Sequence, residues 1–271
     1  MTYREESPSR PPWVFLHGLL RQGSDGAPLF GAVAPDYTIF SPDHAGHGRA
    51  GVRLDSYCVV EHLPHLESYL AGTVGVPAIV YGHSMGAMLA AALAAKRPDL
   101  VRAVILEDPP FHTMGARLAG TVLHGYFSAI RPCVGDRSLT AARLGAVRVP
   151  ISTAGTTALL SEVREAAQIR YMAKCFSEAD PRILDPVIAG TWLDGYDVEA
   201  VLRGLRCPAL LLQSDPAAGG MLTDEDVAAA VRLGADVTAV RMANGIGHQA
   251  HWQDTAGVLR HMLAFLGSLE Q

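Results

Sequence analysis

Six short apolar runs recur along the chain, and each one ends in turn-forming or polar residues. The runs occupy residues 13–18, 37–43, 78–84, 103–109, 208–214 and 237–243. They lack the alternation of apolar and polar residues that marks a half-exposed strand. Continuous apolar runs of this length are typical of parallel strands that are covered on both faces. The sequence therefore predicts a mostly parallel sheet of about six strands.

Helical patterns separate these runs. They cover residues 56–71, 84–97, 223–234 and 253–269, where apolar side chains recur at helical spacing. Strands that alternate with helices predict an α/β fold with a doubly wound sheet.

One long stretch interrupts this rhythm. Residues 111–205 contain no convincing strand, only helical patterns such as residues 157–176. We expect residues 112–195 to form a helical cap, inserted after the strand that ends near Asp108. Residues 1–111 and 196–271 would then form the core of the fold.

Composition narrows the functional classes. Hydrophobic residues make up 49% of the chain and charged residues 18%, with a net charge of -5 and no basic block, so nucleic acid is not an expected partner. The first 13 residues lack the apolar core of a signal peptide, and no apolar stretch reaches the roughly 18 residues that span a membrane. The four cysteines form no CxxC pair and suggest free thiols. These features predict a cytoplasmic protein without a membrane partner, and they leave a homodimer open.

The pentapeptide GHSMG contains the strongest chemical signal. It places Ser84 between Gly82 and Gly86, after an apolar run and before an alanine-rich helical pattern. G-x-S-x-G in a strand–turn–helix context is typical of a nucleophile elbow, where a strained turn needs small neighbours. The alternative is a serine that only caps an ordinary helix.

A nucleophilic serine needs a general base. His248 lies in a glycine-flanked loop after the last predicted strand, from which its imidazole could reach Ser84, and His251 is the reserve candidate. His62 and His65 are interpreted as surface residues of a helix. His44 and His47 have no convincing third ligand, so neither a metal nor a cofactor is expected.

Four segments resemble, in order, landmarks of the α/β-hydrolase fold superfamily. They are FLHGLL, SPDHAGHG, GHSMGAM and GIGHQAHW, and the resemblance covers nearly the whole chain. It points to the serine-hydrolase branch, in members similar to esterases and lactonases. It implies that the backbone N–H groups of Leu19 and Met85 form the oxyanion hole.

The resemblance also assigns supporting roles. His17 and His83 would be structural, and Asp43 would brace its loop through hydrogen bonds. Members of this superfamily usually have two strands before the first one predicted here, so those leading strands are expected to be lost or reduced.

The acid of the triad is ambiguous in the sequence. The position where the superfamily usually carries it falls on Ala217, within QSDPAAGG. Asp215 lies on the same loop, and Asp108 ends the preceding core strand. Certain haloalkane dehalogenases and fungal zearalenone lactonases of this superfamily use an acid at the latter place, so we favour Asp108, with Glu107 well behind.

These elements predict a serine hydrolase with Ser84, His248 and Asp108 as its catalytic residues. The expected substrate is a medium-sized apolar carboxylic ester or lactone. Alternatives are a carbon–carbon bond hydrolase, a lyase, a cofactor-free haloperoxidase, or a small-molecule receptor with little turnover. Residues of the insertion and its approach would bind the substrate: Phe111, Met114, Tyr171 and Trp192.

Overall fold

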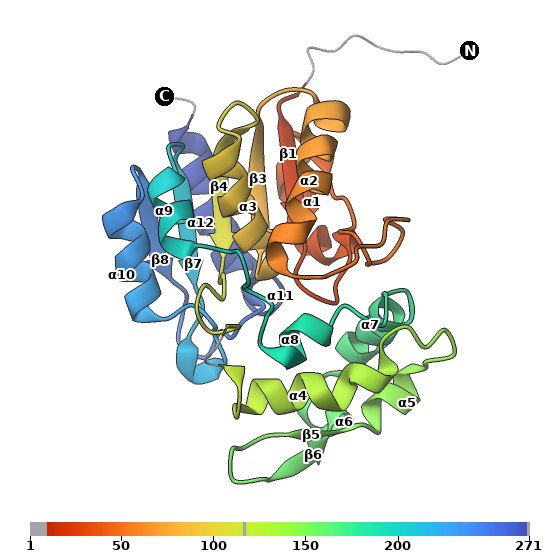
Figure 1. Ribbon diagram of the computed structural model, residues 1–271. Coiled ribbons are helices and arrows are strands. Elements are labelled where there is room, and N and C mark those ends of the chain that lie inside the picture. Colours follow the sequence, from red (N-terminus) through yellow and green to blue (C-terminus); the bar gives the residue numbers. More distant parts are fainter. Residues whose placement is uncertain (1–9, 116–117, 270–271) are drawn as a thin grey trace, which may run out of the picture.

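The computed structural model describes residues 10–115 and 118–269, and a six-stranded parallel sheet forms its centre (Figure 1). Each of the six predicted runs overlaps one strand, which confirms the α/β prediction. The order across the sheet is β2-β1-β3-β4-β7-β8, and every neighbouring pair is parallel. The strands are β1 (Pro12–Leu16), β2 (Thr38–Phe40), β3 (Ala78–His83), β4 (Val101–Glu107), β7 (Ala209–Gln213) and β8 (Val237–Arg241). The segment before Arg10, where reduced leading strands were expected, lies outside the described residues.

Side chains of the strands alternate between two hydrophobic cores. On β1, Trp13 and Phe15 enter the core beneath α1 and α12, whereas Val14 and Leu16 enter the core beneath α2, α3 and α9. This alternation follows from the two-residue period of a strand. It explains why these strands are apolar throughout.

Helices cover both faces of the sheet (Figure 1). They are α1 (Ala27–Val33), α2 (Leu63–Tyr69), α3 (Met85–Lys96), α9 (Val198–Gly204), α10 (Asp224–Leu233), α11 (Ala250–Gln253) and α12 (Thr255–Ser268). The helix predicted over residues 56–71 forms in three consecutive parts, a 3-10 turn (Val59–His62), α2 and a π turn (Leu70–Val74). Its α-helical part begins just before Pro64, whose missing N–H suits the first turn, and a π turn ends at Gly75, which has a φ of 76°.

The segment between β4 and α9 lies beside the carboxyl edge of the sheet (Figure 1). It contains α4 (Val122–Ile130), α5 (Ala141–Gly145), α6 (Leu160–Val163), α7 (Ala166–Ser177) and α8 (Asp185–Ala189). Two sequence predictions are wrong here. An antiparallel hairpin forms from β5 (Arg148–Pro150) and β6 (Thr157–Leu159), and the helix expected over residues 157–176 is interrupted at Arg164, whose backbone is extended. Strands of three residues are too short to show a periodicity.

The turn between β3 and α3 is the tightest point of the core. A Cβ atom on Gly82 would lie 2.2 Å from the carbonyl oxygen of Gly86, and one on Gly86 would lie 2.0 Å from that of Leu16. Both contacts are with backbone atoms, so no side chain can move to relieve them. The two glycines of GHSMG are therefore required by packing.

Replacing Gly86 with alanine is expected to destabilise the protein by about 3 kcal/mol, because a side chain must displace the β1 backbone. Gly267→Ala is the matched control, since nothing lies within 4 Å of its Cβ position on the exposed side of α12. That change is expected to stabilise slightly, by about 0.5 kcal/mol. Urea unfolding measures both, and equal effects would contradict the packing argument.

Candidate active site

Ser84 occupies a strained turn between β3 and α3. Its φ of 56° and ψ of -120° are uncommon for a residue other than glycine. The backbone N–H of Ser84 donates to the carbonyl oxygen of Glu107 on the neighbouring strand, at 2.9 Å. The turn is thereby fixed to the sheet, and its hydroxyl lies in the wall of a cavity.

His248 lies between Ser84 and Asp108. Its Nδ1 is 2.6 Å from Asp108 Oδ2, and its Nε2 is 2.9 Å from Ser84 Oγ. A carboxylate only accepts hydrogen bonds, so Nδ1–H donates to it and Nε2 remains an acceptor for the serine hydroxyl. The geometry is that of a nucleophile, a general base and an orienting acid.

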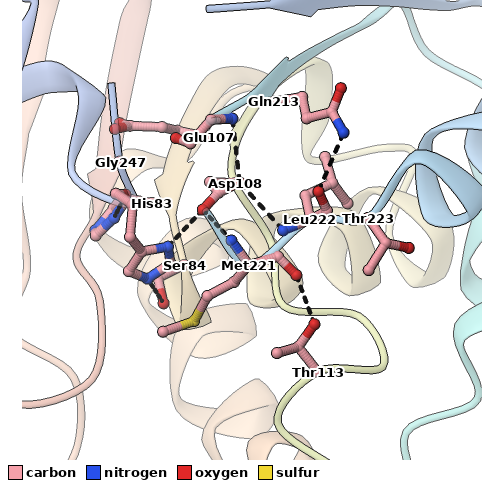
Figure 2. Close-up of polar contacts among 12 residues, drawn as sticks. His83, Ser84, Glu107, Asp108, Thr113, Gln213, Met221, Leu222, Thr223 and Gly247 are labelled. Atoms are coloured by element: carbon pink, nitrogen blue, oxygen red, sulfur yellow. Dashed lines mark hydrogen bonds and ion pairs between the residues drawn. The ribbon is translucent and has the colours of Figure 1, made fainter. Parts of the chain in front are cut away.

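Asp108 is fully buried and is surrounded by donors (Figure 2). Its carboxylate accepts hydrogen bonds from the backbone N–H groups of Ser214 (3.2 Å), Met221 (2.8 Å) and Leu222 (3.2 Å), besides His248. Every one of these partners complements a negative charge. A buried carboxylate is stable only with such compensation.

Neighbouring side chains hold two of these donors in place. Thr113 Oγ1–H donates to the carbonyl oxygen of Met221 at 2.6 Å, and Gln213 Nε2 donates to that of Leu222 at 3.2 Å (Figure 2). The carboxylate pocket is therefore built by β4, the loop after β7 and the start of the insertion. Nothing in the sequence pattern marked residues 221–222 as part of it.

Asp215, the competing candidate, is occupied elsewhere. Its carboxylate accepts hydrogen bonds from the backbone N–H groups of Gly245 (2.8 Å) and Ala217 (3.0 Å), and Arg241 lies 3.8 Å away. These two hydrogen bonds lower its pKa. Asp215 thus braces the loop that leads to His248, while Asp108 is the carboxylate that contacts the imidazole.

His251, the reserve base, points away from Ser84 into a second network. Its Nδ1 lies 2.9 Å from Glu107 Oε1, and its Nε2 lies 3.5 Å from Asp25 Oδ2, with all three side chains fully buried. Burial alone would lower the pKa of His251, but the charge of Glu107 and the contact with Asp25 raise it to about 10. His251 is therefore a charged structural partner of two carboxylates.

Asp25, His83 and His251 also form a group with metal-ligand spacing. One ligand atom from each lies within 4.8 Å of the others. A protonated His251 has no lone pair to offer a metal, so the raised pKa favours the ion-pair network instead. His83 donates from Nε2 to the carbonyl oxygen of His248 at 2.8 Å, which fits its predicted structural role.

The loop after β1 runs close to the nucleophile. A Cβ atom on Gly18 would lie only 3.3 Å from Ser84 Cβ, and Leu20 has a positive φ of 58°. Within the described residues, the backbone N–H groups of Leu19 and Met85 donate to no other group. Both remain free for an oxyanion, as the resemblance implies.

Buried histidines support the loop after β1 through hydrogen bonds to backbone groups. His47 Nε2 accepts a hydrogen bond from the backbone N–H of Leu20 at 3.1 Å, and its Nδ1–H donates to the carbonyl oxygen of Ala45. Burial lowers the pKa of His47 to about 4, which keeps the accepting nitrogen unprotonated. His17 likewise accepts from the backbone N–H of His44.

The prediction that His62 lies on the surface is wrong. Its side chain is buried against the rings of His44, His47 and Tyr57, whereas His65 is exposed as predicted. His62 ends the 3-10 turn that precedes α2, and its ring is buried there. Asp43 braces the nearby loop, as expected, by accepting from the N–H groups of Gly23 and Arg49.

A cavity of about 1070 Å³ opens above Ser84, between the core and the insertion. Met114 and Trp192 contribute to its wall, whereas Phe111 is buried in the core and Tyr171 is not part of the wall. Sequence reasoning missed the glycine-containing loop at residues 218–221 and the polar side chains of the wall. Other lining residues are Arg21, Leu123, Tyr126, Phe127, Ile130, Val149, Leu160, Arg164, Met172, Phe176, Gln249 and Gln253.

Comparison with known proteins identifies the fold. The model of the alpha/beta hydrolase fold matches residues 11–127. The enol-lactonase from Burkholderia xenovorans LB400 superposes with a TM-score of 0.68 and 18% sequence identity, over 97% of this chain and 94% of that one. The chain therefore has the alpha/beta hydrolase fold.

Curated relatives match over shorter stretches. The 2-(acetamidomethylene)succinate hydrolase of Mesorhizobium japonicum is 30% identical over 103 residues, which is 38% of this chain and 37% of that protein. The lipase LipV of Mycobacterium tuberculosis is 34% identical over 116 residues, 42% of this chain and 44% of that protein. The matched part thus spans less than half of either relative.

Among the described residues, no helix is long and apolar enough to cross a membrane.

Replacing Asp108 with asparagine is expected to slow covalent labelling of Ser84 by a fluorophosphonate probe about 10³- to 10⁴-fold, because His248 loses its orienting carboxylate. Asp215→Asn is the matched control and should change the rate less than about tenfold, since it loosens only the loop. Labelling reactions quenched at set times and analysed by mass spectrometry measure the rate for both variants. A greater loss in the Asp215 variant would reverse the assignment.

Stability is expected to fall on the alkaline side of neutrality. The pKa of His251 rises from 6.5 to about 10 on folding, so its contribution is complete below pH 6.5 and is lost as the pH rises towards 10. Between about pH 7.5 and 8.5 the free energy of unfolding should drop by about 1 kcal/mol. Urea titrations at these two pH values test this, and an unchanged or higher stability at pH 8.5 would contradict it.

Proposed function

We propose that this α/β-hydrolase is a serine hydrolase that cleaves a carboxylic ester or lactone of medium size and largely apolar character. The observation that carries the proposal is the continuous chain of contacts from Ser84 Oγ through His248 to buried Asp108, opening into a large cavity. The names of a lipase and an enol-lactonase among similar proteins support ester-type chemistry. Many unrelated reactions use this fold, so the site and not the fold carries the argument.

The geometry supports a two-step acyl transfer. His248 Nε2 takes the proton of Ser84 Oγ as that oxygen attacks the substrate carbonyl, and the N–H groups of Leu19 and Met85 hold the resulting oxyanion. His248 then gives the proton to the leaving alcohol, or to the ring-opened end of a lactone. Asp108 holds the tautomer and stabilises the imidazolium in both steps.

Water completes the cycle. A water molecule loses a proton to His248 and attacks the acyl carbon, and the acid leaves as Ser84 regains its proton. In this proposal the segment 112–195 acts as a cap over the cavity and selects the substrate, with Met114 and Trp192 among its walls. Apolar walls with a few polar groups are typical of small-molecule sites.

Ser84→Ala is expected to reduce hydrolysis of 4-nitrophenyl butyrate about 10⁴-fold or more, because the nucleophile is lost. Ser268→Ala is the matched control, since this exposed serine contacts only the carbonyl oxygen of Phe265 at the end of α12. Release of 4-nitrophenol measures both. Tight binding of ester analogues by the wild-type protein without any turnover of esters or lactones would contradict the proposal and indicate a receptor.

A further inference from the structure

Arg21 is a cationic residue of the loop that follows β1. It follows Leu19 by two residues, and its backbone N–H donates to the carbonyl oxygen of Gly18 at 3.1 Å. Arg21 is half-buried and lines the cavity together with Ser84 and His248. Arg21 and Ser84 therefore line the same cavity, in which Ser84 would attack the substrate carbonyl.

The guanidinium group of Arg21 has no bonded partner. Within residues 10–115 and 118–269 it makes neither a hydrogen bond nor an ion pair, and its one specific contact is with the ring of Tyr171, at 5.6 Å from the ring centre. Guanidinium groups that are partly removed from water normally find acceptors. Stacking on Tyr171 holds the group in place but leaves its N–H donors unused.

The carboxylate of Asp25 is influenced by the charge of Arg21 but forms no ion pair with its guanidinium. Burial would raise the pKa of Asp25, and the charge of Arg21 helps to lower it. The carboxylate oxygens are directed elsewhere, because Oδ1 accepts from Trp252 Nε1 at 3.0 Å and Oδ2 faces His251. Neither oxygen comes within ion-pair distance of the guanidinium.

Further polar groups lie on the same wall. Tyr126 is half-buried, and its phenol experiences the positive charges of both Arg164 and Arg21. The acidic residues of the wall, Glu162 and Glu165, are exposed, and Glu162 already accepts from the N–H of Leu159 at 2.8 Å. Among these charged residues of the wall, Arg21 is half-buried, whereas Arg164 is exposed like the two glutamates.

We propose that Arg21 binds a carboxylate group of the substrate, so that the substrate class is an ester or lactone bearing a carboxylate close to the scissile carbonyl. This inference rests on the proposed hydrolase function. A planar guanidinium with free donors matches a carboxylate in a bidentate arrangement, which fixes orientation as well as charge. The remaining apolar wall accommodates the body of the substrate.

The test compares substrates of equal length with and without the charge. Mono(4-nitrophenyl) glutarate carries a carboxylate on the acyl side, and 4-nitrophenyl pentanoate is its neutral partner. On the leaving-group side, 4-acetoxybenzoate is paired with its methyl ester. Arg21→Gln should lower kcat/KM for one anionic substrate about 10- to 100-fold, mainly through KM, and change its neutral partner less than about twofold.

Two further variants separate specificity from loop damage. Arg21→Lys keeps the charge but not the fork, and it should fall between the wild type and Arg21→Gln. Arg170→Gln removes an exposed charge from α7 outside the cavity wall and should leave both substrates unaffected. An equal loss for the charged and neutral partners, or no loss for either charged substrate, would overturn the proposal.

A binding measurement covers the case in which no ester is turned over. Calorimetry with monomethyl glutarate, in Ser84→Ala and in Ser84→Ala with Arg21→Gln, measures the contact without chemistry. Weaker binding in the double variant, with no turnover of any ester by the wild type, would support the carboxylate contact and reject the hydrolase function. Equal binding in both would reject the role of Arg21.

Discussion

The hydrogen-bonded pocket around the Asp108 carboxylate is the interaction on which the active site depends. It joins the end of β4, the loop after β7 and the imidazole of His248 in one buried cluster. A buried negative charge without these donors would be strongly unfavourable. The same contacts that stabilise the charge therefore fix the position of the base.

Ser84 lies on the side of His248 opposite Asp108, and close packing holds its backbone in place. The strained backbone of Ser84 is held by two glycines that contact backbone atoms of β1 and α3, and by a hydrogen bond to β4. Buried histidines support the neighbouring loop, where low pKa values keep His44 and His47 neutral. Ser84, His248 and the free amides thus rest on a core that gives each a single arrangement.

Local features of the sequence predicted much of this arrangement. The six strands and the elbow at Ser84 were readable because apolar runs and required glycines are local properties. Asp108 needed a family resemblance, since the spacing also allowed Asp215. The burial of His62, the ion pairs of His251 and the hairpin at residues 148–159 depend on contacts between distant segments, and no periodicity reports those. The unpartnered guanidinium of Arg21 is visible only when its surroundings are known.

The central claim is that Ser84, His248 and the amides of Leu19 and Met85 act together on the carbonyl group of one substrate. A crystal structure of the protein after reaction with a phosphonate ester tests it most directly. The account predicts phosphorus bonded to Ser84 Oγ, with one phosphonyl oxygen about 2.7–3.1 Å from both amide nitrogens and His248 still bound to Asp108. Phosphorus on another residue, or an oxygen directed away from both amides, would contradict it.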